Sequence, residues 1–231
     1  MKIGILKPGR VPDDLLPRYG DYDSMFVRLL GETHFSFEVY SILDGHLPED
    51  PEAADAWLIT GSRHGVYEPH AWIEPLETFI RACFAVKRPI AGICFGHQII
   101  AQAMGGRVEK FHDGWSIGAK TYDFDDGEAL SIMAFHQDQV IEAPADAKCF
   151  LQNDFCRYAG LSYGQQALTL QPHPEFEAGF MAELIMDRSA ILGEALQAQA
   201  LASLQRSLST QKIAGVLARF FLNPGQAPYL D

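Results

Sequence analysis

Short apolar segments alternate with segments of helical periodicity over the N-terminal part of the chain. The short segments are rich in β-branched and aromatic residues, whereas the longer ones repeat their apolar residues every three or four positions. In order, they are 3–6 (strand), 24–30 (helix), 35–42 (strand), 56–60 (strand), 72–86 (helix), 89–93 (strand) and 95–104 (helix). This alternation predicts an α/β fold with an open, doubly wound, mostly parallel sheet flanked by helices.

Strand patterns dominate the next part of the chain, and helical patterns dominate the last part. The strand patterns lie at 117–124, 129–135, 148–151 and 167–170, and we expect them to add antiparallel strands to the sheet. The helical patterns lie at 176–191, 194–208 and 213–222. The first is amphipathic and predicts packing on the sheet, whereas the middle one is rich in alanine and glutamine and predicts an exposed arm.

A single domain over residues 1–231 accounts for this order of elements, because neither a repeat nor a low-complexity linker divides the chain. We expect a core over residues 1–190 and a helical C-terminal extension over 191–231. Two interpretations of the extension stay open. It adds a packing layer, or it forms a dimerisation or lid element, in which case these helices would join copies in an oligomer.

Cys94 stands where a predicted strand runs directly into a predicted helix, with Gly92 two residues before it and Gly96 two residues after it. This Gly-x-nucleophile-x-Gly arrangement is typical of a nucleophile elbow, a tight turn in which glycines relieve crowding of the backbone. The sulfur would sit at a helix N-terminus, whose partial positive charge favours thiolate over thiol. The alternative is a buried cysteine in an ordinary strand–helix turn.

A second motif, Gln-Pro-His-Pro-Glu-Phe over residues 171–176, follows the strand pattern at 167–170. The two prolines keep the residues before them out of the α region, so the segment is extended. Residues two apart in an extended chain share a face, so His173 and Glu175 project together. An imidazole beside a carboxylate suits a general base, although His-Pro-Glu alone is more often a surface turn.

The two motifs, in this order and at this separation, resemble the class I glutamine amidotransferase family, also called the triad type. The resemblance runs from the first predicted strand through Glu175, about three quarters of the chain. It implies that Cys94 is the nucleophile, that His173 is the general base and acid, and that Glu175 is the third member of the triad. It also implies glutamine hydrolysis as the activity.

Weaker matches extend this resemblance to the rest of a site. The loop Gly61-Ser62-Arg63 follows the third strand, where the family has its oxyanion-hole loop, which implies the N–H groups of Ser62 and Phe95 as donors. Substrate-binding positions of the family match Gln98, directly after the elbow, and Phe135, Gln137 and Asp138 in a segment that closes over the glutamyl group. These assignments place the site at the carboxyl ends of the strands, where such folds bind ligands.

Two positions depart from the family pattern. Gly61-Ser62-Arg63 replaces the common Gly-Gly-Pro of the oxyanion loop, and a serine supplies the backbone N–H only if its φ and ψ fit. Phe135 replaces a small polar residue, so only main-chain contacts remain available there. This second change bears on which γ-glutamyl compound fits the site.

Composition excludes several other classes of protein. A formal net charge of −12 argues against sequence-independent nucleic-acid binding and against docking on anionic membranes. Neither a signal-peptide core nor an apolar run of membrane-spanning length occurs. The 4 cysteines form no dense disulfide framework, and the 8 histidines do not cluster at ligand spacings. We therefore expect a cytoplasmic protein with no metal site and no cofactor.

Three functions remain open. Amidotransferases normally pass ammonia to a synthase, and the chain contains neither a glycine-rich phosphate loop nor a second α/β unit. A separate synthase subunit would then receive the ammonia, which we favour narrowly. Alternatively, the protein is a stand-alone γ-glutamyl hydrolase or peptidase. A non-catalytic ligand-binding protein on the same fold is the least favoured, because the triad residues are intact.

Overall fold

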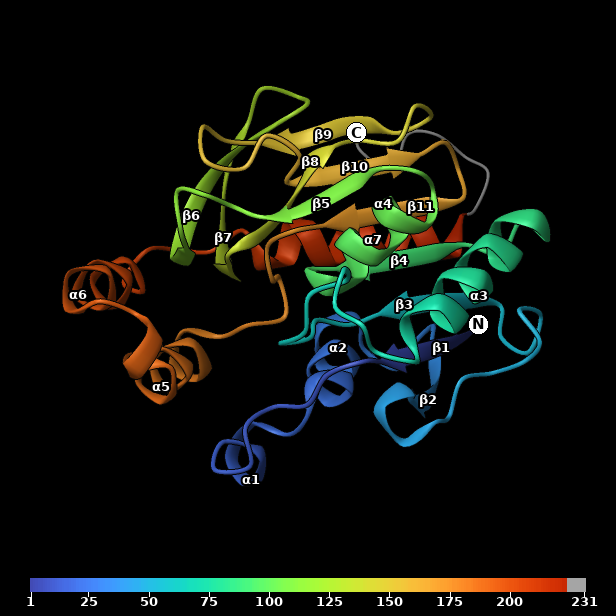
Figure 1. The fold of residues 1–231 in the computed structure, drawn as a ribbon, viewed down its shortest axis with the longest axis horizontal. Helices are drawn as coiled ribbons and strands as arrows, with labels where there is room; N and C mark the ends of the chain where they lie inside the picture. Colours follow the sequence, from blue (N-terminus) through green and yellow to red (C-terminus); the bar gives the residue numbers. More distant parts are fainter. Residues whose placement is uncertain (224–231) are drawn as a thin grey trace.

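A nine-stranded mixed sheet runs through the computed structural model, which describes residues 1–223 (Figure 1). Its strand order is β2-β1-β3-β4-β11-β10-β9-β6-β7. The pairs from β2 to β11 are parallel, and the pairs from β11 to β7 are antiparallel. This arrangement confirms the predicted fold class, with the added antiparallel strands on one side of the parallel ones.

The strands are β1 (Lys2–Lys7), β2 (Ser36–Ser41), β3 (Ala56–Ile59), β4 (Ile90–Ile93), β5 (Arg107–Lys110), β6 (Ser116–Phe124), β7 (Ala129–His136), β8 (Asp138–Glu142), β9 (Lys148–Gln152), β10 (Gly160–Tyr163) and β11 (Ala167–Leu170). The helices are α1 (Leu16–Tyr19), α2 (Tyr22–Leu30), α3 (Ile73–Ala85), α4 (Phe95–Ala103), α5 (Ala178–Asp187), α6 (Glu194–Ser203) and α7 (Thr210–Leu222), with 3-10 turns η1 (Ile42–Asp44) and η2 (Ser189–Ile191). The sequence pattern missed β5, β8 and β10.

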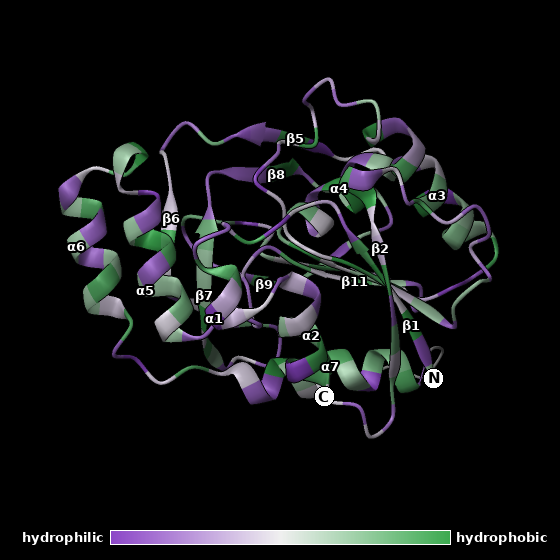
Figure 2. Ribbon diagram, turned by 90° about the horizontal axis from the view of Figure 1, so that it is seen from below, coloured by the Kyte–Doolittle hydropathy of each residue, from purple (hydrophilic) through white to green (hydrophobic). Residues whose placement is uncertain are grey.

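Helices cover both faces of the parallel strands because successive strand residues point to opposite sides. On one face, Trp57 and Ile59 of β3 pack with apolar residues of α3 and α4. On the other face, Leu58 packs with residues of α2 and α7. The four residues of β3, and likewise those of β4, are fully buried, which is why they are continuously apolar. In Figure 2 the strands that cross the centre of the molecule are mainly green, as are parts of α5, α6 and α7.

The C-terminal helices pack in two places. The amphipathic helix α7 lies in the main core through Ile213, Leu217 and Phe220, so this part of the extension is a packing layer. Helices α5 and α6 lie at the other end of the molecule, next to β6 and β7, with which they share an apolar cluster (Figure 1). The predicted packing of the first helix on the sheet is thus confirmed. The last eight positions of the expected extension, 224–231, lie outside the described residues.

The middle helix is mostly exposed, as expected, with only Ala200 of α6 buried, but the expectation that it forms a separate arm is wrong. Helix α6 docks on β6, where the Ser203 hydroxyl accepts a hydrogen bond of 2.9 Å from the N–H of Ala119. Gly118, at a φ of 88°, makes the close approach possible, because a Cβ there would lie 2.9 Å from the carbonyl oxygen of Ala200. Small residues make the closest part of this contact, and Leu196 and Leu201 of α6 pack on the apolar cluster beside it. Over residues 1–223, no helix is both long and apolar enough to cross a membrane.

Candidate active site

Cys94 follows β4 and precedes α4 at a turn with a strained backbone. Its φ of 53° and ψ of −102° lie outside the regions that residues with a Cβ usually occupy. A Cβ on Gly92 would collide with the backbone carbonyl of Gly96, and a Cβ on Gly96 would collide with the carbonyl of Ile59 in β3. Glycine at both positions therefore allows the turn to pack tightly against the sheet.

His173 comes close to Cys94 because the two residues follow neighbouring strands. Strands β4 and β11 pair in parallel with Ile93 opposite Leu170, and the N–H of Cys94 donates to the Leu170 carbonyl at 2.7 Å. The segment after β11 continues extended, and the N–H of His173 donates to the carbonyl of Met133 in β7 at 2.7 Å. The carboxyl end of the sheet thus brings the sulfur and the imidazole together.

Glu175 contacts the imidazole on the side away from the sulfur. The Nδ1–H of His173 donates to Oε1 of Glu175 at 2.7 Å, and both side chains are almost fully buried. Burial alone would lower the pKa of His173, but the negative charges of Glu175 and Cys94, and hydrogen bonds to both, raise this pKa to about 10. The arrangement can therefore hold an imidazolium beside the sulfur.

Gly61 lies against both of these side chains. A Cβ at Gly61 would be 3.0 Å from Cε1 of His173 and 3.8 Å from the Cβ of Cys94, so the loop after β3 closes over them. Ser62 lines the same cavity as Cys94, and Phe95 is the first residue of α4. The loop and the start of the helix approach the sulfur from two directions, as two oxyanion donors need to do.

The end of β1 and the residues that follow it support the loop after β3. The Ser62 hydroxyl donates to the carbonyl of Pro8 at 2.9 Å, and the N–H of Thr60 donates to the carbonyl of Leu6 at 3.1 Å. Gly9 approaches so closely that a Cβ there would lie 2.5 Å from the carbonyl oxygen of Gly61. Contacts within the chain therefore fix the position of the loop.

A cavity of about 360 Å³ opens beside Cys94. Of the residues predicted from the sequence, those that line it are Ser62, Cys94, Gln98, Phe135, Gln137, Asp138 and His173. The other three, Glu175, Gly61 and Phe95, lie outside the lining. The fold thus gathers residues from the loops after β3, β4, β7 and β11 around one space.

The predicted substrate-binding residues also contact one another. The side-chain amide of Gln98 donates to the carbonyl of Asp138 at 2.9 Å and to Oε1 of Gln171 at 3.0 Å. The carboxylate of Asp138 accepts a hydrogen bond of 3.0 Å from the Tyr67 hydroxyl, and burial raises the pKa of Asp138. Gln98 therefore ties the elbow helix to the start of β8, while Phe135 packs edge to face on Trp115.

Several lining residues were missed by sequence reasoning. They include the cations Arg63, Lys110 and Arg188, and the apolar residues Trp115, Leu184 and Ile191. Arg63 directly follows Ser62, so the oxyanion loop itself could have indicated it. The others come from β5, from the loop before β6 and from α5 and η2, and no local motif marks them.

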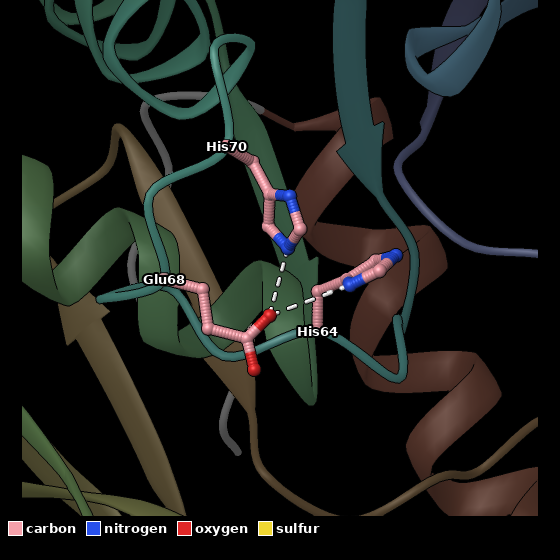
Figure 3. Close-up of side chains that lie close together, drawn as sticks. All are labelled: His64, Glu68 and His70. Atoms are coloured by element: carbon pink, nitrogen blue, oxygen red, sulfur yellow. Dashed lines mark hydrogen bonds and ion pairs between the residues drawn. The ribbon is translucent and has the colours of Figure 1, made fainter.

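The expectation that the histidines do not cluster is wrong for one pair. The rings of His64 and His70 lie 4.3 Å apart between centroids, and Glu68 Oε2 lies between them (Figure 3). This carboxylate oxygen is 2.7 Å from Nε2 of His70 and 3.4 Å from Nδ1 of His64. The three side chains can offer one ligand atom each to a metal ion, with all three atoms within 4.8 Å of one another.

Comparison with known sequences identifies the family. A family model described as glutamine amidotransferase class-I matches residues 16–191. Gamma-glutamyl peptidase 2 of Arabidopsis thaliana is 33% identical over 180 residues, which cover 72% of this chain and 73% of that protein. The glutamine-hydrolysing GMP synthase of Limosilactobacillus reuteri is 26% identical over 170 residues, but these cover only 32% of the synthase against 67% of this chain.

Solved structures show the same fold over almost the whole chain. A glutamine amidotransferase from Thermotoga maritima superposes with a TM-score of 0.72 at 22% identity, covering 95% of this chain and 96% of that one. A glutamine amidotransferase from Methylobacillus flagellatus gives a TM-score of 0.74 at 18% identity, covering 95% of this chain and 90% of that one. At these identities the likeness concerns the fold.

Proposed function

Because the chain belongs to the class I glutamine amidotransferase family, we propose that it hydrolyses γ-glutamyl amide bonds with Cys94, His173 and Glu175 as its triad. The observation that carries this proposal is the short hydrogen bond of 2.7 Å between His173 and Glu175, next to a cysteine at a strained elbow. A buried cysteine of purely structural importance needs neither the strain nor an oriented imidazole.

The reaction proceeds by acyl transfer. The Cys94 sulfur attacks the γ-carbonyl carbon, and the N–H groups of Ser62 and Phe95 stabilise the oxyanion of the tetrahedral intermediate. The imidazolium of His173 gives its proton to the departing amine as the carbon–nitrogen bond breaks, which leaves a γ-glutamyl thioester. His173 then takes a proton from water, the resulting hydroxide attacks the thioester, and glutamate leaves with the sulfur restored.

We further propose that this chain acts without a synthase partner. Such a partner commonly orders the oxyanion loop, but here Pro8 and Gly9 already support Gly61 and Ser62 from within the chain. The relative named gamma-glutamyl peptidase 2, which the match covers over 73% of its length, supports a peptidase-type activity for this chain. Since Cys94 must stay reduced, the cytoplasm is the compartment that suits this chemistry.

The charges around the cavity favour substrates with more carboxylates than glutamine has. Arg63, Lys110 and Arg188 outnumber the two carboxylates that also line the cavity, those of Glu68 and Asp138, although the chain as a whole carries a net charge of −12. A γ-glutamyl peptide brings two carboxylates, one on the glutamyl group and one at its other end. Glutamine is therefore expected to be a substrate, but not the preferred one.

The test is a hydrolysis screen of the isolated protein on glutamine, γ-glutamyl amines and γ-glutamyl peptides, with glutamate release as the readout. We expect turnover by the wild-type chain, none by Cys94→Ala, and unchanged turnover by Cys149→Ala, which alters a half-buried thiol elsewhere. A folded protein that is inactive on every compound, though its Cys94 can be alkylated, would refute the stand-alone function.

A second candidate function is a glutaminase subunit that supplies ammonia to a separate synthase. The match to part of the Limosilactobacillus reuteri GMP synthase supports it, because the matched stretch there is joined to a much longer chain. This function predicts slow glutamine hydrolysis by the isolated protein and a large acceleration on addition of the synthase. Helix α6 of the C-terminal extension, of which only Ala200 is buried, would be available to such a partner.

A further inference from the structure

The loop that carries Ser62 continues through His64, Glu68 and His70 before helix α3 begins at Ile73. The short spacing brings the three side chains together because the loop folds back on itself, with the N–H of His70 donating to the carbonyl of Glu68 at 2.8 Å. Figure 3 shows both imidazole rings directed at the same carboxylate. His64 and Glu68 also line the cavity that contains Cys94.

This set of donor atoms is the one that zinc prefers in sites with an open position. Two imidazole nitrogens and one carboxylate oxygen bind Zn²⁺ at about 2.0–2.2 Å, and a fourth position remains for water or a ligand. Ligand atoms around a tetrahedral ion lie roughly 3.3 Å apart, as follows from those bond lengths. The Glu68 oxygen lies 2.7 Å from Nε2 of His70 and 3.4 Å from Nδ1 of His64, and all three atoms lie within 4.8 Å of one another. Binding therefore changes these separations by no more than about 1.5 Å.

We propose that His64, Glu68 and His70 form a binding site for a divalent transition-metal ion, with Zn²⁺ as the ion that fits best. The side chains are partly exposed, at 20% for His64, 40% for Glu68 and 33% for His70, so an ion reaches them from solvent. Harder ions such as Mg²⁺ and Ca²⁺ prefer oxygen ligands and are excluded by the two imidazoles.

Neighbouring groups hold the ligand side chains in place. The ring of His70 stacks on Trp72, with centroids 5.4 Å apart and planes 8° from parallel. The backbone N–H of His64 donates to the Ser62 hydroxyl at 3.2 Å. Such outer contacts orient ligands before the ion arrives, which reduces the ordering that binding requires.

The same contacts join the metal site to both proposed oxyanion donors. The backbone N–H of His64 is hydrogen-bonded to the Ser62 hydroxyl. Trp72 contacts both His70 and Phe95, with 5.6 Å between the centroids of the Trp72 and Phe95 rings. An ion on the cluster would therefore stiffen the segment from Ser62 to Trp72. The alternative is that Glu68 merely accepts hydrogen bonds from two imidazoles and binds nothing.

Zinc binding is best measured in the Cys94→Ala background, because a thiolate beside an imidazole is itself a zinc ligand. The metal-free full chain is titrated with Zn²⁺ against a chromogenic chelator of known affinity. We expect one equivalent to bind, and His64→Ala and His70→Ala each to weaken binding at least tenfold. His112→Ala removes an exposed histidine outside the cluster and is the matched control, with unchanged binding.

Cobalt gives a readout that is independent of affinity. Co²⁺ in the same background should show the intense visible bands of a four-coordinate ion, and these bands should disappear in His70→Ala and persist in His112→Ala. Glu68→Gln keeps the shape and loses the charge, so it provides a weaker but folded variant if either alanine variant unfolds. Absence of binding, or binding that survives Glu68→Gln and both alanine substitutions unchanged, would overturn the proposal.

Discussion

The imidazole of His173 lies face to face with the ring of Phe176, with centroids 4.0 Å apart and planes 6° from parallel. Phe176 is itself held by Phe180, edge to face at 4.7 Å, and by Tyr22, stacked at 6.1 Å. The hydrogen bond to Glu175 prevents the imidazole from rotating within its own plane, and the stacked Phe176 ring prevents it from tilting out of that plane. The orientation of the proposed base therefore depends on Phe176, to which the sequence analysis assigned no role.

Replacing the Phe176 ring should lower the rate of the chemical step and leave substrate binding nearly unchanged. Phe176→Leu keeps an apolar side chain but removes the flat surface, so the imidazole gains freedom to tilt. We expect kcat to fall by about ten- to a hundredfold, the range that small displacements of reacting groups produce, with KM nearly unchanged. Steady-state kinetics on a γ-glutamyl substrate measures this. A fall in kcat that is accompanied by a clear drop in the melting temperature would indicate a general structural effect instead.

Cys94 should be the first thiol to react with an alkylating agent at neutral pH. Burial raises the pKa of Cys83 to about 12 and also raises the pKa of Cys156 and of Cys149. Cys94, in contrast, lines the open cavity and has His173 as a base beside it. Peptide mapping after brief iodoacetamide treatment checks this order, and earlier labelling of Cys83 or Cys149 would contradict the assignment of the nucleophile.

The stability of the fold should decrease as the pH rises above neutrality. The pKa of His173 is raised to about 10 from an ordinary 6.5, so the folded state binds this proton more tightly than the unfolded chain. The resulting stabilisation is complete below pH 6.5 and is lost as the pH rises through about 10. Its size is on the order of a few kcal/mol.

Glu175→Gln separates this contribution from those of other groups. The amide keeps the shape of the carboxylate but removes the negative charge that holds the proton on His173. Urea unfolding at pH 6.5 and at pH 10 should show a smaller loss of stability in this variant than in wild type. We also expect it to retain partial activity, whereas His173→Ala loses nearly all. An unchanged rate and pH profile would remove Glu175 from the mechanism.

Gly61→Ala should lower activity by disturbing the loop that carries the proposed oxyanion donor Ser62. Its new methyl group would lie 3.0 Å from Cε1 of His173, so either the loop or the imidazole must move. We expect a loss of about a hundredfold or more in kcat, comparable to the removal of one oxyanion donor. Gly193→Ala is the matched control, because a Cβ there meets nothing within 4 Å, and its activity should equal that of wild type.

The parts of the fold and site that the sequence could predict are those encoded by neighbouring residues. Cys94 between two glycines and His173 two residues before Glu175 are local patterns, and the structure brings them together through the pairing of β4 with β11. Their catalytic roles stay predictions. The parallel strands β3 and β4 were evident for a similar reason, since full burial requires an unbroken apolar run.

The features that the sequence did not predict depend on contacts between distant or folded-back segments. Helix α6 approaches β6 through Gly118, Ala200 and Ser203, and small residues in close contact leave no hydrophobic periodicity to read. The cluster of His64 with His70 depends on a fold-back of the loop around Pro69, which spacing alone does not reveal. His173 and Phe176 are close in the sequence, but their rings stack only because of the path that the backbone takes after Glu175. The sequence does not show this path.

The far wall of the cavity has a separate origin from its reactive wall. Leu184, Arg188 and Ile191 come from α5 and the turn after it, whereas Cys94 and His173 are anchored in the central sheet. The proposed triad and these three lining residues therefore belong to different segments of the chain, so we expect the three residues to be replaceable without moving the triad. A library confined to these three positions should change the range of compounds accepted while every member still forms the acyl-enzyme, and this offers a direct route to redesigning the substrate range in the laboratory.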